Sequence, residues 1–266
     1  MDLRFSLVGL LIGFLIGLTG VGGGSLMTPV MILIMGVKPI IAVGTDTVYG
    51  AVTKIVGGAA HLRQGSVDRR AAYWLASGSV PASLLGVGLI GVIKRADPAF
   101  INGFLVRSIA WALIFVAVIL AVKPILSAAG RRLGLAGDGS WRDDLVEHGL
   151  RYPWLLTMVG AVVGFLVGLT SVGGGSLVII VLFFLYPRWQ SVRLVGTDVF
   201  HAAILGGAAS LAQLASGNVN LGMMFSLLLG SVPGVLLGSR FAVGFHERYL
   251  RLSLASVLLI SGAKLL

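Results

Sequence analysis

The 266-residue chain is 57% hydrophobic and only 11% charged, whereas a soluble domain is about 25% charged, so the composition excludes an ordinary soluble protein and predicts a multi-pass membrane protein. No cysteine is present, which excludes disulfides, cysteine nucleophiles, iron–sulfur clusters and thiolate metal sites. The net charge of +10 indicates Lys and Arg gathered in cytoplasmic loops, and we expect no nucleic-acid partner.

In chain order, the apolar stretches form the same succession twice, on either side of one polar linker. Each succession opens with a long apolar segment and continues with stretches of about 20 residues, the length of a transmembrane helix. The first repeat (1–122) contains segment 5–36 and spans 41–60, 71–93 and 100–122, the linker covers 123–152, and the second repeat (153–266) contains segment 153–186 and spans 195–214, 219–241 and 249–266. We therefore expect an all-α membrane protein.

The two repeats are copies of one sequence unit. Residues 13–26 read GFLIGLTGVGGGSL, and residues 164–177 read GFLVGLTSVGGGSL. Further along, the Gly-Thr-Asp of residues 44–46 recurs at 196–198. Matches in the same order along both halves indicate a duplication.

The long segments 5–36 and 153–186 are each interrupted by a run of glycines. Three consecutive glycines cost a continuous helix about 1 kcal/mol each relative to alanine, so we expect two short helices that meet at a loop within the membrane. Such a segment either crosses as a broken helix or turns back as a hairpin. If it turns back, the repeats are inverted and most arginines share one face. This asymmetry favours two inverted repeats, each a glycine-broken helical hairpin plus three transmembrane helices.

The glycine loops are candidate binding sites for an anion. Glycine lets the backbone approach a ligand closely, and a helix that restarts after the loop points free N–H groups toward it. Broken helices at corresponding places in two repeats are typical of transporter binding sites. The alternative is that the glycines only allow tight helix packing. The candidate residues are Thr19, Gly20, Val21, Gly22, Gly23, Gly24 and Ser25 in the first loop, and Thr170, Ser171, Val172, Gly173, Gly174, Gly175 and Ser176 in the second.

A Thr-Asp pair opens one span in each repeat, as Thr45-Asp46 and Thr197-Asp198. One interpretation is a helix N-cap, since both side chains accept hydrogen bonds from the first free N–H groups of a helix. The other is a polar gate, with the threonines at the substrate and the aspartates exchanging protons, because carboxylates inside a membrane are costly and usually face a pathway. The two interpretations are compatible.

The repeats differ at two positions that can carry charge. Lys54 faces Gly206 when the copies are aligned, and His201 faces Tyr49. Lys54 lies inside a predicted span, where an ammonium needs a partner, so we expect it to pair with Asp46 or to attract an anionic substrate. His201 is a candidate proton carrier, and the alternative is a packing residue that forms a hydrogen bond.

The sequence contains no recognisable catalytic or metal-binding arrangement. Its four histidines do not cluster with carboxylates at the spacing of a metal site, and a nucleotide-binding fingerprint is missing. We therefore expect neither an enzyme nor a cofactor, and transport that is driven by a gradient or runs passively.

The duplicated element G-x-x-x-G-L-T-x-V-G-G-G-S-L, followed by V-G-T-D, resembles the sulfite exporter TauE/SafE family of bacterial membrane proteins over essentially the whole chain. The resemblance implies a secondary transporter in the bacterial inner membrane that exports sulfite, sulfoacetate or a related organosulfonate. Carried over by position, the family's motifs are the glycine-rich loops 20–25 and 171–176 and the Gly-Thr segments 44–45 and 196–197. The second repeat departs from the first where Ile179-Ile180 replaces Thr28-Pro29.

On this basis we expect alternating access between the two repeats, with the lipid bilayer and a small anionic substrate as partners. We expect the linker to be cytoplasmic, both termini to be periplasmic, and a homodimer by analogy with transporters of similar size. The alternatives are a passive anion channel with the same pore elements, and a non-transporting membrane scaffold or assembly factor.

Overall fold

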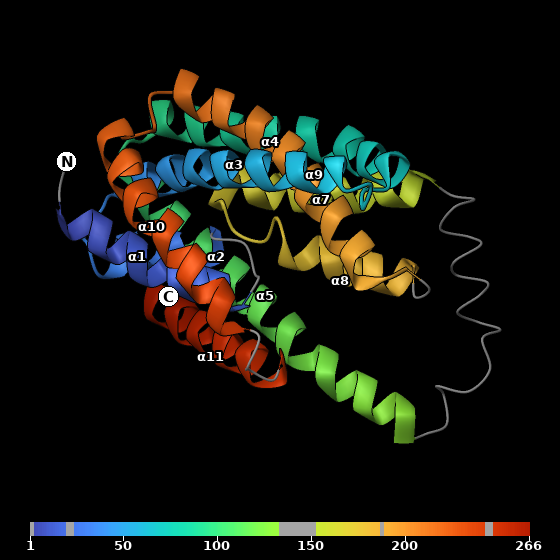
Figure 1. Ribbon diagram of the computed structural model, residues 1–266. Coiled ribbons are helices and arrows are strands. Elements are labelled where there is room, and N and C mark those ends of the chain that lie inside the picture. Colours follow the sequence, from blue (N-terminus) through green and yellow to red (C-terminus); the bar gives the residue numbers. More distant parts are fainter. Residues whose placement is uncertain (1–2, 20–23, 133–152, 187–188, 243–246) are drawn as a thin grey trace.

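The computed structural model describes residues 3–19, 24–132, 153–186, 189–242 and 247–266, and in these ranges every regular element is an α-helix (Figure 1). The expected all-α fold is confirmed. The helices are α1 (Leu3–Thr19), α2 (Gly24–Leu33), α3 (Pro39–Arg63), α4 (Arg69–Ala96), α5 (Phe100–Arg132), α7 (Pro153–Thr170), α8 (Ser176–Leu185), α9 (Ser191–Ala215), α10 (Leu221–Ala242) and α11 (Glu247–Leu265).

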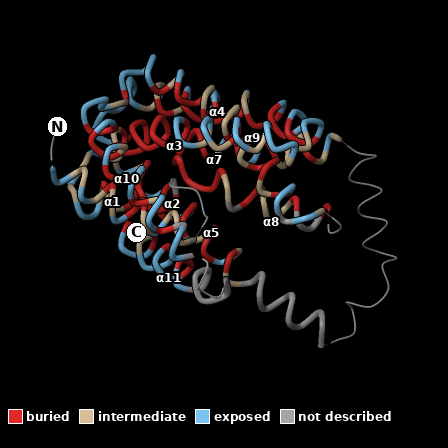
Figure 2. The backbone as a smooth tube through the Cα atoms, viewed as in Figure 1, coloured by how far each residue is buried: buried red, intermediate tan, exposed pale blue. Residues whose placement is uncertain are grey.

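The lengths and the exposed surface of these helices are those of a multi-pass membrane protein. Within the described ranges, six helical stretches are long and apolar enough to span a membrane: Pro39–Arg63, Arg69–Ala96, Phe100–Ala121, Pro153–Thr170, Val192–Ala215 and Leu221–Gly238. Exposed stretches lie on the outside of the bundle and buried ones between the helices (Figure 2). Leu85 and Leu211 are 70% and 71% exposed on this outer surface, as lipid-facing side chains would be.

Each predicted span corresponds to one helix, with differences at the ends. The largest difference is at α5, which continues past the expected end at residue 122 as far as Arg132. The first part of the predicted linker is therefore helical, and the rest of it, 133–152, lies outside the described residues. The predicted break in the second long segment is confirmed, because α7 ends at Thr170 and α8 begins at Ser176.

Helices of one repeat pair with helices of the other, and glycines set how closely they approach. α7 lies along α4, and its counterpart α1 lies along α10. A Cβ added at Gly160, Gly164 or Gly168 of α7 would come within 2.1 to 2.2 Å of backbone oxygens of α4. No side chain fits there, so these helix glycines have the close-packing role that small residues have in membrane helices.

The central pair, α3 and α9, consists of equivalent helices that run in opposite directions. Gly58 near the end of α3 contacts Phe200 near the start of α9, whereas Thr47 near the start of α3 accepts a hydrogen bond from Ser210 Oγ at 3.2 Å, further along α9. α5 and α11, the last helices of the two repeats, also pair. Each of these pairs thus joins a helix of one repeat to a helix of the other.

The segment α7–α8 returns to the end of the bundle from which it starts. Pro153 and Leu156 at the start of α7, and Tyr186 and Trp189 after α8, line one cavity. In Figure 1, α7 and α8 run in opposite directions on either side of the break. The two chain termini lie at the other end of the bundle from the flanks of the linker (Figure 1).

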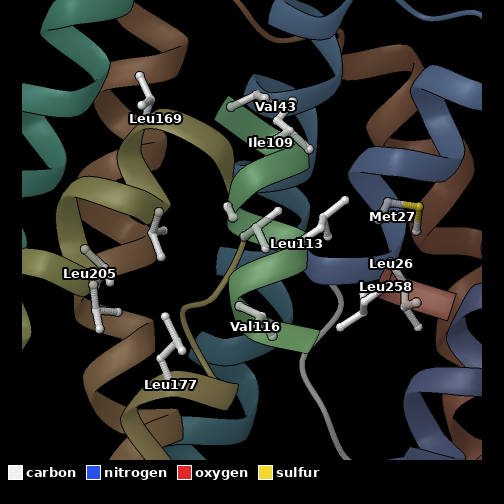
Figure 3. Close-up of a cluster of buried hydrophobic side chains, with 14 of the residues drawn as sticks. Leu26, Met27, Val43, Ile109, Leu113, Val116, Leu169, Leu177, Leu205 and Leu258 are labelled. Carbon is white, nitrogen blue, oxygen red and sulfur yellow. The ribbon is translucent and has the colours of Figure 1, made fainter. Parts of the chain in front are cut away.

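A buried cluster around α5 holds these pairs together. Ile109, Leu113 and Val116 of α5 lie between side chains from α2, α3 and α11 on one side and from α7, α8 and α9 on the other (Figure 3). Because α5 contacts both α7 and α8, it helps to hold the break between these two helices beside the central pair.

Candidate functional site

A small cavity lies where α3, α9 and the loop after α7 meet. Its volume is about 20 Å³, room for about one water molecule. The lining residues come from three elements: Asp46, Thr47, Gly50, Ala51 and Lys54 of α3, Val167 and Ser171 of α7 and its loop, and Ala202, Leu205 and Gly206 of α9. The structure therefore brings the candidate lysine, one candidate aspartate and the second glycine loop to one place.

Lys54 lies at the centre of this arrangement. Its Nζ is 3.3 Å from the position that a Cβ would occupy on Gly174, so the ammonium rests directly on the second glycine loop. It interacts electrostatically with Asp46, as the sequence predicts, and also with Asp198 of the other repeat. One cation thus interacts with two carboxylates, one from each of the equivalent helices α3 and α9.

Asp46 joins elements of both repeats. Its carboxylate is fully buried and accepts a hydrogen bond from Thr28 Oγ1 of α2 at 2.5 Å. The Ser171 side chain of the second glycine loop lies close enough to this carboxylate to interact with it. Its Oδ1 atom has no hydrogen-bond partner among the described residues. A hairpin helix of the first repeat and the loop of the second are therefore both connected to this carboxylate.

Asp198, the counterpart of Asp46, has a poorer set of partners. It is 2% exposed, and its Oδ1 atom finds no hydrogen-bond partner in the described part of the chain. The position that corresponds to Thr28 is Ile179, which has no hydroxyl to donate. Lys54 is the charged group that offsets the burial of this carboxylate. The replacement of Thr28-Pro29 by Ile179-Ile180 in the second repeat thus gives the two aspartates different hydrogen-bond partners.

His201 and Tyr49 occupy equivalent positions and use equivalent partners. His201 Nε2 lies 2.8 Å from Ser79 Oγ of α4, and the Tyr49 side chain interacts with that of Ser231 of α10. Ser79 and Ser231 correspond in the two repeats. His201 is fully buried, and its Nδ1 has no partner among the described residues. The expected packing role is present at Nε2, and the proton-carrier role stays a prediction.

The second glycine loop has an unusual backbone. Ser171 adopts φ +62° and Gly173 φ +100°, in the left-handed region that side chains avoid. The copy of Ser171 in the first repeat is Gly20, which is free to adopt such angles. A serine that bears this strain places a hydroxyl beside Asp46, and strained residues of this kind concentrate at functional sites.

Other residues of the two loops have different surroundings. Thr170 Oγ1 donates to the Leu166 carbonyl at 2.7 Å and accepts from the Val172 N–H at 3.2 Å, so its hydroxyl stabilises the end of α7. Gly175 caps α8 without a side-chain bond. Ser25 is buried, and its Oγ has no partner among the described residues. The predictions at Gly20, Val21, Gly22 and Gly23 lie outside the described residues, as do the side-chain surroundings of Thr19, Gly24 and Ser176.

The N-cap interpretation of Thr45-Asp46 and Thr197-Asp198 is wrong. α3 begins at Pro39 and α9 at Ser191, so both pairs lie inside their helices. The threonine hydroxyls accept hydrogen bonds from the other repeat: Thr45 Oγ1 from the Asn220 N–H at 3.0 Å, and Thr197 Oγ1 from the Asp68 N–H at 2.9 Å. These hydroxyls fix the starts of α10 and α4 rather than line the cavity.

The actual caps are residues that sequence reasoning missed. Asp68 Oδ1 accepts from the Ala71 N–H at the start of α4, and Asn220 Oδ1 accepts from the Met223 N–H at the start of α10, both at 3.0 Å. Each residue follows a glycine turn at the corresponding place in its repeat, and this pattern could have predicted both caps from the sequence. Within the described ranges, no group of three or more His, Asp or Glu side chains could hold a metal ion.

Comparisons with known proteins give one matching family and several similar chains. The model of the family described as Sulfite exporter TauE/SafE matches residues 5–265. A "Probable membrane transporter protein YjnA" of Bacillus subtilis is 37% identical over the full length of both chains. YunE of the same organism, also named a probable membrane transporter protein, is 27% identical over 91% of this chain and 87% of its own. A third, MJ0441 of Methanocaldococcus jannaschii, is 25% identical over 96% and 92%. No solved structure matches the chain.

Proposed function

Because this chain belongs to the sulfite exporter TauE/SafE family and is a membrane transporter rather than an enzyme, we propose that it exports a small sulfur-containing anion across the bacterial inner membrane. The proposed substrates are sulfite, sulfoacetate or a related organosulfonate, and the proposed mechanism is secondary transport with alternating access between the two repeats.

The observation that carries this proposal is the position of Lys54. Its ammonium lies on the second glycine loop and serves both Asp46 and Asp198. A charge of this kind within a membrane-spanning helix marks a substrate or ion pathway. A small oxyanion at the loop would take the place of a carboxylate as the partner of Lys54. A carboxylate freed in this way, or His201, then exchanges a proton during the cycle.

The substrate must enter through a conformational change. The cavity beside Lys54 has a volume of about 20 Å³, enough for about one water molecule and too little for a four-atom oxyanion. The α7–α8 hairpin carries one wall of the cavity, and α3 and α9 carry the others. Movement of the hairpin relative to the α3–α9 pair would open the cavity to one side.

The proposed mechanism requires inverted repeats, and two features of the fold support them. α3 and α9 are equivalent helices that run antiparallel, and the α7–α8 segment returns to the end from which it starts. Arg70 at the start of α4 and Arg193 at the start of α9 lie at the end where the linker attaches. The positive-inside tendency then makes that end cytoplasmic and both termini periplasmic.

Flux in proteoliposomes tests the proposal. The purified protein is reconstituted, the vesicles are loaded with sulfite or sulfoacetate, and efflux is followed with and without a pH gradient. We expect Lys54→Ala to abolish most of the flux, and Lys264→Ala, which removes an exposed lysine at the end of α11, to leave it unchanged. Equal flux in the two variants would exclude the site at Lys54. Flux that never runs against a gradient would identify a channel, and no flux of any tested anion would favour a scaffold.

A further inference from the structure

A second cavity, larger than the one at Lys54, lies at the linker end of the bundle. Its volume is about 200 Å³. It is bounded by the start of α4, the start of α7 and the segment that follows α8, and its lining residues are Asp68, Arg70, Ala71, Trp74, Pro153, Leu156, Tyr186 and Trp189. It shares none of its residues with the central cavity, and the proposed transport site makes no use of it.

Among the residues that the structure describes, the charges around this cavity leave one cation uncompensated. Asp68 Oδ2 forms a salt bridge with Arg193 at 2.6 Å, and Asp68 Oδ1 caps α4. Arg193 also lies over the Trp189 ring, with 4.6 Å from its guanidinium carbon to the ring centroid. Asp68 and Arg193 therefore neutralise each other at the rim. Arg70 forms neither a hydrogen bond nor an ion pair with the residues that the structure describes, and its guanidinium is free to bind an anion bidentately.

Three aromatic side chains also line the cavity. Tyr186 and Trp189 stack with their centroids 4.0 Å apart and their planes 15° from parallel. Trp74 of α4 adds a third ring that is 39% exposed. Stacked rings held in one orientation present a rigid apolar surface at little entropic cost. Beside a free guanidinium, such a wall suits a molecule with an anionic group at one end and an apolar portion at the other.

The arrangement exists in one repeat only. The positions that correspond to Asp68, Arg70 and Trp74 are Asn220, Gly222 and Ser226. Asn220 keeps the capping role of Asp68, so the cap is what the fold requires in both repeats. The guanidinium and the indole are additions to one copy, and the fold of the other copy forms without them.

From this combination we propose that the second cavity is a binding site for small organic anions, namely sulfonates that carry a short apolar portion. The assignment of the bound molecule as a transport substrate rests on the proposed function. In that setting the cavity is the first binding site that a substrate meets on the linker side, and it selects organosulfonates over sulfite.

Binding can be measured without transport. The protein is placed in nanodiscs of zwitterionic lipid and titrated with 1-propanesulfonate, and then with sulfite, which lacks an apolar portion. Tryptophan fluorescence reports binding because Trp74 and Trp189 line the cavity. We expect saturable binding of propanesulfonate and an affinity for sulfite at least tenfold lower. Arg70→Ala should weaken propanesulfonate binding by roughly tenfold or more, as loss of a charge-assisted hydrogen bond does.

The neighbouring Arg69→Ala, whose side chain does not line the cavity, is the matched control and should bind as the unmodified protein does. Equal affinity in Arg70→Ala and Arg69→Ala would overturn the proposal, and so would equal affinity for sulfite and propanesulfonate. A second set of nanodiscs contains phosphatidylglycerol; if that lipid abolishes propanesulfonate binding, the cavity is a lipid site and the proposal fails. Lys54→Ala separates the two hypotheses, because it should stop flux and leave binding at this cavity intact.

Discussion

Replacement of Gly164 by alanine should separate α7 from α4 and destabilise the protein. A Cβ at this position would lie 2.1 Å from the Ser79 carbonyl oxygen and 2.5 Å from the Ser79 Cα. Heavy atoms at rest are roughly 3.5–4.0 Å apart, so the two helices must move apart by about 1 Å or more. Overpacking of this kind costs about 1–3 kcal/mol, which exceeds the gain of roughly 0.5–1 kcal/mol from replacing glycine in a helix.

The assay is thermal unfolding of the purified protein in detergent, followed by circular dichroism. Gly88→Ala is the control, because a Cβ at Gly88 of α4 meets no atom within 4 Å; it should unfold at the same temperature as the unmodified protein or a higher one. Gly164→Ala should unfold at a lower temperature. It should also disturb the His201–Ser79 contact of 2.8 Å, because Ser79 is the residue displaced. An unfolding temperature for Gly164→Ala at or above that of Gly88→Ala would refute the close helix contact.

Two further predictions concern polar contacts between elements. Thr28→Val removes the hydroxyl that donates to Asp46 at nearly constant volume. It should lower the free energy of unfolding by about 1–3 kcal/mol, because a buried acceptor loses its donor. The comparison is Thr53→Val, whose hydroxyl donates to a carbonyl within α3, and equal unfolding temperatures for the two variants would contradict the role of Thr28. Asp68→Asn keeps the cap of α4 but loses the half-exposed ion pair with Arg193, so it should cost under about 1 kcal/mol, whereas Asp68→Ala should cost about 1 kcal/mol more. Equal unfolding temperatures for the two Asp68 variants would mean that the cap contributes nothing.

Hydropathy and the duplicated motif were enough to predict the helices and the break in the second repeat. A membrane span needs a fixed length of apolar chain, and three glycines interrupt a helix wherever it packs, so both signals are local. The prediction of inverted repeats rested on loop charge, which constrains the side of the membrane on which each loop lies but not how the helices pack.

Contacts between distant residues could not be predicted in the same way. Thr28 with Asp46, Ser79 with His201 and Lys54 with Asp198 depend on how α2, α4 and α9 pack around α3, and apolar patterns alone do not specify which faces meet. The interaction of Lys54 with Asp46 was predictable, because a charge inside a span requires partners, and a role of Lys54 in transport stays a prediction. The error at Thr45 has a local cause: Pro39 favours a helix start at that point, several residues before the threonine. At Thr197 the equivalent helix starts at Ser191 without a proline.

The central claim is that Lys54 and the second glycine loop hold the transported anion. Crystals grown with selenite, a heavier analogue of sulfite, would give an anomalous-scattering map that locates the anion directly. If Lys54 and this loop hold the anion, a peak lies between Lys54 Nζ and the loop 171–175 and disappears in Lys54→Ala. A peak elsewhere in the bundle, or one that persists at this place in Lys54→Ala, would contradict it.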